Sequence, residues 1–304
     1  MSDSLFIEIG THQQQKHGED CFGDTIYSKK IPEERRIISI LSDGLGSGVK
    51  ANILSSMTTR MAMKFVESNM ELLRSSEVMM DALPICQVRK ISYATFSIVD
   101  SELEGKTRIF EMDNPPHIFI RDGRPLNVKC KELSSPKWKD RTINISQITT
   151  QEEDRIILMS DGVTQAGLGN KLYPLGWQRQ GCLDFVLKTI KKNPHISAHD
   201  LAKAIVHEAI EKEVEKKLRE RVKKELHGRA FKFVSPGYNG VPDRIVLLPG
   251  GRIYFVETKA PGKTLRKLQE RVHDEIRALG FEVWTVDTKE KVDEFIRWAG
   301  GGLH

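Results

Sequence analysis

Two acidic residues and a lysine flank a glycine turn in the last third of the chain. Asp243 opens one apolar run, Pro249-Gly250-Gly251 interrupts it, and a second apolar run leads to Glu257 and Lys259. Pro and Gly between two apolar runs indicate a β-hairpin. If the hairpin is centred on Gly250, paired residue numbers add up to 500, so Asp243 faces Glu257 at about 5 Å. Lys259 lies two residues further along and therefore on the same face.

This arrangement would need a cation, because two carboxylates this close repel each other. Mg²⁺ or Mn²⁺ is the expected cofactor, since hard cations take oxygen ligands, and the backbone carbonyl of Thr258 is a further candidate ligand. Such a metal can acidify a water and polarise a phosphodiester, with Lys259 orienting or deprotonating the attacking water. The alternative is a surface hairpin with a cross-strand Glu–Lys pair and an Asp–Arg turn, and the spacing alone leaves it open.

The surroundings of this hairpin resemble the virus-type replication-repair nucleases (VRR-NUC), a branch of the PD-(D/E)xK nucleases. The resemblance covers residues 211–304. It rests on these stretches: Glu211-Lys-Glu-Val-Glu215, Phe233-Val-Ser-Pro-Gly, Gly240-Val-Pro-Asp243, Gly251-Arg-Ile-Tyr-Phe-Val-Glu257-Thr-Lys259-Ala-Pro-Gly and Leu268-Gln269.

The resemblance implies that Asp243 and Glu257 are metal ligands and that Lys259 is the catalytic lysine. A helix glutamate would complete the metal shell. Glu211 fits that position best, and Glu215, one turn on, is the second choice. A solvated helix residue is the alternative for Glu211.

Further residues of this part are candidates for contacts around the site. Gln269 would lie near the site on the next helix. The stretch Ser235-Pro-Gly-Tyr238 is expected to form a loop at the DNA-facing edge. Four basic residues would contact phosphates or simply form a charged helix face: Lys263, Arg266, Lys267 and Arg271.

A second pattern occurs twice in the first two thirds of the chain. Residues 36–44 and 155–162 are each an apolar run that ends in Ser-Asp-Gly. An aspartate at a strand end, followed by glycine, exposes a carboxylate and a backbone carbonyl to a metal. A simple Asp-Gly turn is the alternative reading for either one.

The stretch Ser42-Asp-Gly-Leu-Gly-Ser-Gly-Val-Lys-Ala51 resembles the stage II sporulation protein E branch of the metal-dependent Ser/Thr phosphatases (PPM family). Glu19-Asp20, Asp113-Asn-Pro-Pro-His117 and Ser160-Asp161-Gly162-Val match further family segments, so the resemblance covers about 1–208. It implies that water bridged between Mg²⁺ or Mn²⁺ ions attacks a phosphoserine or phosphothreonine. The implied ligands are Asp20, Asp43, the Gly44 carbonyl and Asp161.

This sequence departs from the phosphatase pattern at its end. Family domains close with a strand opened by an acidic pair, whereas here the helix with His207-Glu208-Ala209-Ile210 runs into the nuclease helix. No such acidic strand follows Asp161. We therefore expect one metal to lack a ligand and one sheet to keep an unpaired edge.

The elements that would position these residues follow from periodicity. In the first part, strands are expected at 5–10, 36–42, 92–99, 107–112, 117–121 and 154–160, and helices at 48–70 and 182–192. In the last part, strands are expected at 230–235, 243–248, 252–258 and 281–286, and helices at 263–279 and 288–299.

One long helix is expected to join the two parts. Ser197 and Asp200 form a capping box, apolar residues recur every four positions from Ile210 to Leu226, and Gly228 is a helix stop. The predicted fold class is thus α/β (α+β). Residues 1–210 would form a PPM-type sandwich, truncated at its end, and 211–304 an α-β-β-β-α-β-α nuclease domain. A junction of two families within a helix is typical of a recombined gene or an engineered fusion.

Composition agrees with a soluble, two-domain cytoplasmic protein. The chain has 304 residues and a net charge of +5, and residues 211–304 hold 20 Lys and Arg against 15 Asp and Glu, leaving 27 of each before them. A basic C-terminal part suits DNA. No signal peptide or membrane span is expected, and four scattered cysteines indicate free thiols.

The sequence favours a metal-dependent nuclease that hydrolyses DNA phosphodiesters, with a homodimer as one way to cut two strands. A metal-dependent Ser/Thr protein phosphatase with an appended nuclease domain is the first alternative, and its partner would be a phosphoprotein. An inactive or engineered fusion scaffold is the second.

Overall fold

The computed structural model describes residues 4–15, 19–44, 46–70, 72–82, 85–86, 91–92, 95–135, 141–169 and 174–301. The chain divides into two compact units. Unit 1 consists of Met1–Thr164 and Gln178–Ile205, and unit 2 of Gln165–Trp177 and Val206–His304. The domain boundary expected at 210/211 stays a prediction.

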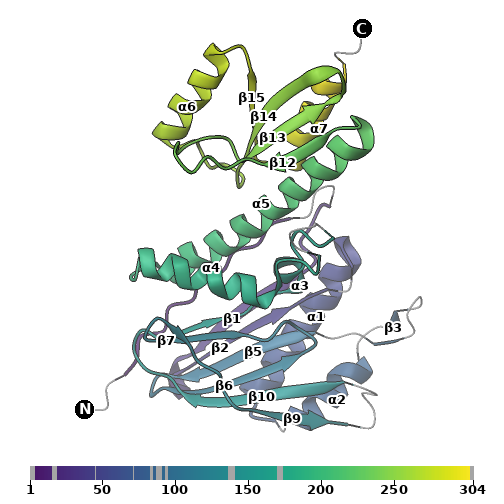
Figure 1. Ribbon diagram of the computed structural model, residues 1–304. Helices are drawn as coiled ribbons and strands as arrows, with labels where there is room; N and C mark the ends of the chain where they lie inside the picture. Colours follow the sequence, from purple (N-terminus) through teal and green to yellow (C-terminus); the bar gives the residue numbers. More distant parts are fainter. Residues whose placement is uncertain are drawn as a thin grey trace. The chain divides into compact units, whose positions relative to one another are not determined.

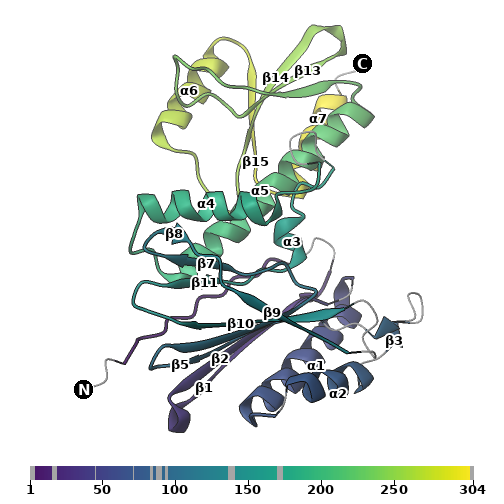
Figure 2. The same cartoon turned by 60° about the horizontal axis from the view of Figure 1, so that its bottom comes forward.

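Unit 1 is built on a six-stranded antiparallel sheet in the order β1-β2-β5-β6-β10-β9. Helices α1 and α2 cover one face of this sheet, and the small sheet β11-β7-β8 and helix α4 lie on its other side (Figure 2). The elements of unit 1 are β1 (Thr25–Ile31), β2 (Arg36–Ser42), α1 (Gly48–Glu67), α2 (Leu72–Ala82), β3 (Ile85–Cys86), β4 (Ile91–Ser92), β5 (Phe96–Glu102), β6 (Lys106–Met112), β7 (Ile118–Arg121), β8 (Arg124–Pro125), β9 (Cys130–Ser134), β10 (Thr142–Thr149), β11 (Arg155–Ile157), α3 (Asp161–Thr164) and α4 (Gln178–Lys192).

The core of unit 1 lies between the helices and the sheet. Ile38, Ile40 and Ile98 are at most 1% exposed and pack with Ala62 and Met63 of α1. Strand β2 lies between β1 and β5, inside the sheet, and its burial pattern is continuous rather than alternating. An apolar run of that kind is typical of a strand covered on both faces.

Unit 2 has a four-stranded sheet in the order β12-β13-β14-β15 (Figure 1). The first three strands are antiparallel, and β15 pairs with β14 in parallel because α6 carries the chain back across the sheet. The elements are α5 (Ala198–Glu225), β12 (Arg229–Lys232), β13 (Arg244–Leu248), β14 (Arg252–Thr258), α6 (Lys267–Ala278), β15 (Glu282–Val286) and α7 (Lys289–Gly300).

Helix α5 supplies the core of unit 2 from its second half. Val214, Leu218 and Val222 are fully buried and spaced by four, so they form one stripe. The stripe packs with α7 against one face of the sheet, where Val246 and Val256 lie. Residues 198–205 of α5 belong to unit 1 and 206–225 to unit 2.

The α/β fold class and the order of elements in unit 2 are confirmed. In unit 1, the strand predicted for 5–10 is wrong. That segment is irregular, its Phe6 side chain is 89% exposed, and Leu5 N donates a single backbone hydrogen bond to Leu103 O. Alternation of apolar residues alone was therefore misleading here.

Several elements of unit 1 went unpredicted: β1, α2, β9 and β10. Both β1 and β9 are edge strands, and β9 is exposed at four of its five positions. An edge strand carries polar residues on both faces and so gives no clear two-residue period. The strand predicted for 92–99 corresponds to β5, and its residues 93–94 lie outside the described residues.

Candidate active sites

The β13–β14 hairpin of unit 2 has the predicted register. Arg244 pairs with Val256 and Leu248 with Arg252, so paired numbers add up to 500. Asp243 immediately precedes β13, one step beyond the last pair, and therefore stands opposite Glu257. Gly250 and Gly251 at the turn have φ angles of 78° and 76°. Glycine adopts this left-handed region at little cost, which is why the turn forms there.

Hydrogen bonds lock the two acidic residues to each other's strand. The Asp243 backbone N donates to Glu257 Oε2 at 3.1 Å. In return, Asp243 Oδ2 accepts from Thr258 N at 3.1 Å and from Thr258 Oγ1 at 3.2 Å. The Glu257 side chain is fully buried. The hairpin thus holds both carboxylates at one place.

Two donors converge on the other oxygen of Glu257. Lys259 Nζ lies 2.5 Å from Glu257 Oε1, and Gln269 Nε2 donates to the same oxygen at 2.5 Å. The pKa of Glu257 is nevertheless raised, first by burial and next by the charge of Asp243, while Lys259 acts in the opposite direction. One ammonium therefore does not fully compensate the two carboxylates.

Of the two candidate glutamates on α5, Glu211 interacts electrostatically with Asp243 and Lys259 of this site. Its pKa is raised to about 7, most of all by burial and then by the charges of Glu208 and Asp243, while Lys259 and Lys263 act in the opposite direction. Glu215 instead forms an ion pair with the buried Arg244. The structure thus brings together Glu211, Asp243, Glu257, Lys259 and Gln269, as the sequence predicted for the first choice of helix residue.

A residue that the sequence analysis missed also lies here. His273 on α6 is fully buried, and its Nε2 is 3.9 Å from Glu257 Oε2. The only signal in the sequence is its position, four residues after Gln269 and so on the same helix face. Burial lowers the pKa of His273, and Arg277 and Lys259 lower it further.

The basic residues of this region are exposed on and before the start of α6: Lys263, Arg266 and Lys267, with Arg271 one turn on. Arg271 already pairs with Glu275 at 3.0 Å. The backbone N of Arg266 donates to Gln269 Oε1 at 3.2 Å, closing a capping box. Helix capping therefore fixes the Gln269 side chain, whose amide reaches Glu257.

Within the described residues, no group of three or more His, Cys, Asp or Glu side chains is drawn together closely enough to hold a metal ion. In unit 2, Lys259 Nζ and Gln269 Nε2 instead both contact Glu257 Oε1. The donor chemistry still fits a hard cation, because carboxylate oxygens are its preferred ligands and the pKa of Glu257 is raised by burial and by the charge of Asp243.

Unit 1 has its own carboxylate cluster around Asp43, at the end of β2. The pKa of Asp43 is raised to about 8 by burial, and then by the charges of Asp24 and Asp161 and by hydrogen bonds to both. A divalent cation would offset the mutual repulsion of these carboxylates, although, as in unit 2, the described side chains are not drawn together closely enough to hold one as they stand. Asp43 and Asp161 were expected here, whereas Asp24 was not.

The β1–β2 register explains why Asp24 is present. Thr25 pairs with Ser42, so Asp24 stands opposite Asp43 one step beyond the ladder. The resemblance through Glu19-Asp20 had instead implied Asp20 as the ligand. Asp20 is exposed, and its role as a ligand stays a prediction. Recognising the polar edge strand β1 would have revealed Asp24.

Close packing fixes the backbone around Asp43. Thr95 Oγ1 lies 2.9 Å from Asp43 N and 2.8 Å from Asp43 O. At Gly44, a Cβ atom would approach the carbonyl oxygens of Ala51 and Gly23 to 2.4 Å, so only glycine fits. Asp161 is the first residue of the short helix α3 and is exposed.

The end of unit 1 agrees with the departure noted in the sequence. Strand β11, just before Asp161, is an edge strand that pairs with β7, and over the described parts of the chain no strand covers its other side. The following segment, residues 165–177, belongs to unit 2. There Gly167 N donates to Glu213 Oε1 at 2.7 Å, and Lys212 Nζ lies 5.1 Å from the centre of the Trp177 ring.

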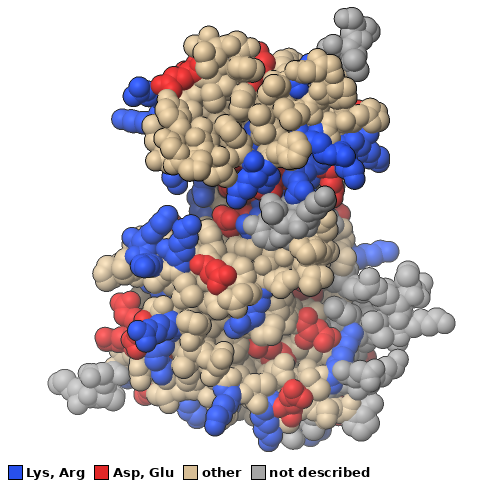
Figure 3. Space-filling model, in the orientation of Figure 1, with Lys and Arg blue, Asp and Glu red and all other residues tan. Residues whose placement is uncertain are grey.

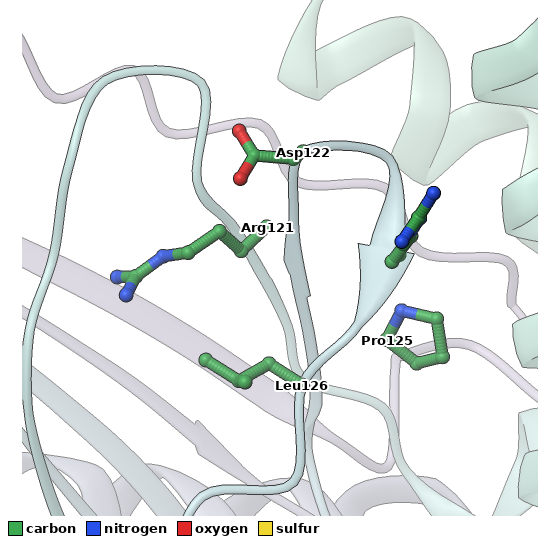
Figure 4. A pocket seen from close by; sticks show the side chains of 5 residues that line it. Arg121, Asp122, Pro125 and Leu126 are labelled. Carbon is green, nitrogen blue, oxygen red and sulfur yellow. The ribbon is translucent and has the colours of Figure 1, made fainter.

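A pocket of about 410 Å³ beside the β7–β8 turn has no such chemistry (Figure 4). Its Arg121 is engaged by Asp154, with Nε–Oδ1 at 2.9 Å and Nη2–Oδ2 at 2.6 Å. The other lining residues are Asp122, Arg124, Pro125 and Leu126. We do not consider it an active site.

Each of the two parts of the chain is similar to known proteins. Residues 33–220 match the family described as Stage II sporulation protein E (SpoIIE). The putative nuclease p44 of Acyrthosiphon pisum secondary endosymbiont phage 1 is 49% identical over 80 residues, which are 26% of this chain and 85% of the phage protein.

Two solved structures are also similar. The PP2C phosphatase domain of SpoIIE from Bacillus subtilis, with a fragment of its regulatory domain, matches 69% of this chain and 59% of its own, with 18% identity and a TM-score of 0.53. A VRR_NUC domain is 35% identical over 29% of this chain and 95% of its own, with a TM-score of 0.28.

These similarities show a protein with two parts, each related to a class of enzymes that hydrolyses phosphoester bonds. The chain belongs to the Stage II sporulation protein E family, and its C-terminal part is a nuclease domain of the VRR-NUC family. Both resemblances noted in the sequence are thus confirmed. No helix in the described part of the chain is long and apolar enough to cross a membrane.

Proposed function

We propose that unit 2 is a divalent-metal-dependent nuclease that hydrolyses DNA phosphodiester bonds. The observation that supports this most directly is the pairing of Asp243 with the buried Glu257 across the hairpin, with Lys259 Nζ 2.5 Å from Glu257 Oε1. The basic residues around α6 and the excess of Lys and Arg in 211–304 favour a polyanionic substrate.

In this proposal Asp243, Glu257, Glu211 and the Thr258 carbonyl would hold Mg²⁺ or Mn²⁺, which would acidify water and polarise the phosphodiester. The chain's own residues do the rest. Lys259, 16% exposed at its side chain, orients the attacking water and offsets charge on the phosphate. Gln269 holds the Glu257 carboxylate in place through its 2.5 Å hydrogen bond.

The test is cleavage of DNA with and without Mg²⁺ or Mn²⁺, comparing the wild type with Lys259→Ala. We expect Lys259→Ala to lose about 10²–10⁴-fold in kcat. Lys224→Ala, an exposed lysine in the last turn of α5, is the matched control and should cleave normally. Equal cleavage by wild type and Lys259→Ala would exclude the assignment.

Substrate structure is tested with a panel of branched, double-stranded linear and single-stranded DNAs of equal length. Preference for a branched substrate would appear as a lower KM or a higher kcat on that substrate. Cleavage of both strands in one binding event, together with a mass of two chains in solution, would indicate a homodimer. Sequential nicking by a single chain would argue against one.

The second candidate function is a metal-dependent Ser/Thr phosphoprotein phosphatase in unit 1. The cluster of Asp24, Asp43 and Asp161 favours it, because these carboxylates and the Gly44 carbonyl would hold Mg²⁺ or Mn²⁺. We expect Mn²⁺-dependent release of phosphate from a phosphoserine peptide by the wild type and by Lys259→Ala, and none by Asp43→Asn. Release that Asp43→Asn leaves unchanged would exclude this function.

A fusion scaffold without activity is the remaining alternative. It predicts that Mg²⁺ and Mn²⁺ change neither the melting temperature nor the turnover of either substrate. The two hydrolytic proposals predict the opposite, because a metal that binds only the folded chain raises its stability.

A further inference from the structure

Helix α6 places two polar side chains against the buried carboxylate of Glu257. Gln269 and His273 are four residues apart and so lie on one face of the helix. Gln269 contacts Glu257 Oε1, and His273 faces the other oxygen, Oε2, at 3.9 Å from its Nε2. Helix α6 therefore places one polar side chain beside each carboxylate oxygen of Glu257, which is a proposed metal ligand.

The two oxygens are not equally satisfied. Oε1 accepts from Lys259 and Gln269, each at 2.5 Å, whereas Oε2 accepts from the Asp243 amide at 3.1 Å. His273 is fully buried, and neither of its ring nitrogens has a hydrogen-bond partner among the described residues. A buried imidazole without a hydrogen-bond partner lowers the stability of the fold. Its position beside Oε2, which accepts one long hydrogen bond, therefore suggests that His273 has a function.

We infer that His273 is a positioning residue that donates a hydrogen bond from Nε2 to Glu257 Oε2 and so fixes Glu257 for metal binding. The inference rests on the proposed nuclease function. A shift of about 1 Å brings the 3.9 Å separation to an ordinary hydrogen-bond length. Because His273 is fully buried, it acts through Glu257 and does not touch DNA.

The experiment compares His273→Leu with His273→Gln. Gln keeps an N–H near the position of Nε2, and Leu fills a similar space without one. All variants are made in the full chain carrying Asp43→Asn, so that the unit 1 site does not bind the probe. The readouts are the Kd for Mn²⁺, the kcat for DNA cleavage and the melting temperature without metal. Val272→Ala, the buried neighbour on α6, is the packing control.

We expect His273→Leu to weaken Mn²⁺ binding by about 10- to 100-fold, the usual effect of losing a group that orients a metal ligand. Its metal-free melting temperature should equal or exceed that of the parent, because an unpartnered buried polar group is removed. His273→Gln should restore the Kd to within about threefold, and Val272→Ala should lower the melting temperature while leaving the Kd within about twofold.

The inference is overturned if His273→Leu binds Mn²⁺ as tightly as the parent, or if Val272→Ala weakens binding equally. If His273→Leu does not fold, His273→Gln decides, because a Kd weakened beyond about tenfold in that variant contradicts a hydrogen-bonding role. Failure of the nuclease proposal gives a different result from failure of the His273 inference alone. In that case the parent chain itself would neither bind Mn²⁺ nor cleave DNA, and both proposals would be excluded.

Discussion

At the scale of single residues, burial decides which titratable groups are unusual. Asp43, Glu211 and Glu257 are carboxyls whose pKa is raised, and in each case burial is the largest cause. The second cause of the raised pKa is another carboxylate, Asp24 for Asp43 and Asp243 for Glu257. Clustered acidic residues with a raised pKa are typical of functional sites.

Asp43 should make the metal-free protein sensitive to pH. Its pKa is raised from 3.8 to about 8, so its contribution to stability is complete below pH 3.8 and is lost as the pH rises through about 8. Between pH 6 and 8 in EDTA, we expect the wild type to lose on the order of 2 kcal/mol more than Asp43→Asn, at ~1.4 kcal/mol per pH unit.

Urea unfolding followed by circular dichroism measures this difference. Asp184→Asn, an exposed aspartate on α4, should follow the wild type. With Mn²⁺ in excess the order should reverse, because the wild type alone gains the binding energy. Identical pH profiles for wild type and Asp43→Asn in EDTA would contradict the carboxylate cluster.

The cysteines offer a second test at this scale. Burial raises the pKa of the Cys182 thiol to about 12, whereas Cys130 is exposed. Since the thiolate is the reactive form, iodoacetamide at pH 8.5 should modify Cys130 rapidly and Cys182 only after unfolding. Peptide mass spectrometry after timed labelling checks this, and rapid native labelling of Cys182 would refute its burial.

At the scale of elements, one hairpin sets the geometry of the proposed nuclease site. Register in a β-hairpin is fixed by its turn, and a slip of one residue would move Asp243 to the other face of the sheet. Gly250 and Gly251 make the turn possible, because both have φ near +77° with open space around the missing Cβ. The geometry of the site therefore depends on Gly250 and Gly251, which take no part in the proposed reaction.

Gly250→Ala should destabilise unit 2 by about 1–2 kcal/mol, the cost of a left-handed conformation for a residue with a Cβ. Gly237→Ala is the matched control, since Gly237 has equally open space and no positive φ. Urea unfolding followed by tryptophan fluorescence compares them, because Trp284 and Trp298 both lie in unit 2. Equal stability of the two variants would show that the turn tolerates a side chain.

At the scale of the whole molecule, charge separates the two parts of the chain. Acidic and basic side chains balance over residues 1–210 and are interspersed on the face shown in Figure 3, while residues 211–304 carry the whole net charge of +5. The proposed binding of DNA to the C-terminal part should therefore weaken with salt, because DNA releases counterions when a protein binds it.

Affinity for DNA in EDTA, where no cleavage is expected, measures this effect. The logarithm of the binding constant should fall linearly with the logarithm of salt concentration, and Lys263→Ala should reduce the slope by about 1. Lys50→Ala, an exposed lysine of α1 in unit 1, should leave the slope unchanged. A slope that Lys263→Ala does not alter would remove Lys263 from the DNA-binding surface.

The sequence by itself determined the architecture of unit 2, the hairpin register and the pairing of Asp243 with Glu257. These depend on local properties, namely apolar periodicity and a glycine turn, which act over a few residues. The tertiary structure decided what depends on neighbours far apart in the chain. It brought Asp24 to Asp43 through a polar edge strand with no clear period, and it engaged Glu215 with Arg244, leaving Glu211 near the site. It also buried His273 against Glu257, because only the packing of α6 on the sheet puts the imidazole next to that carboxylate.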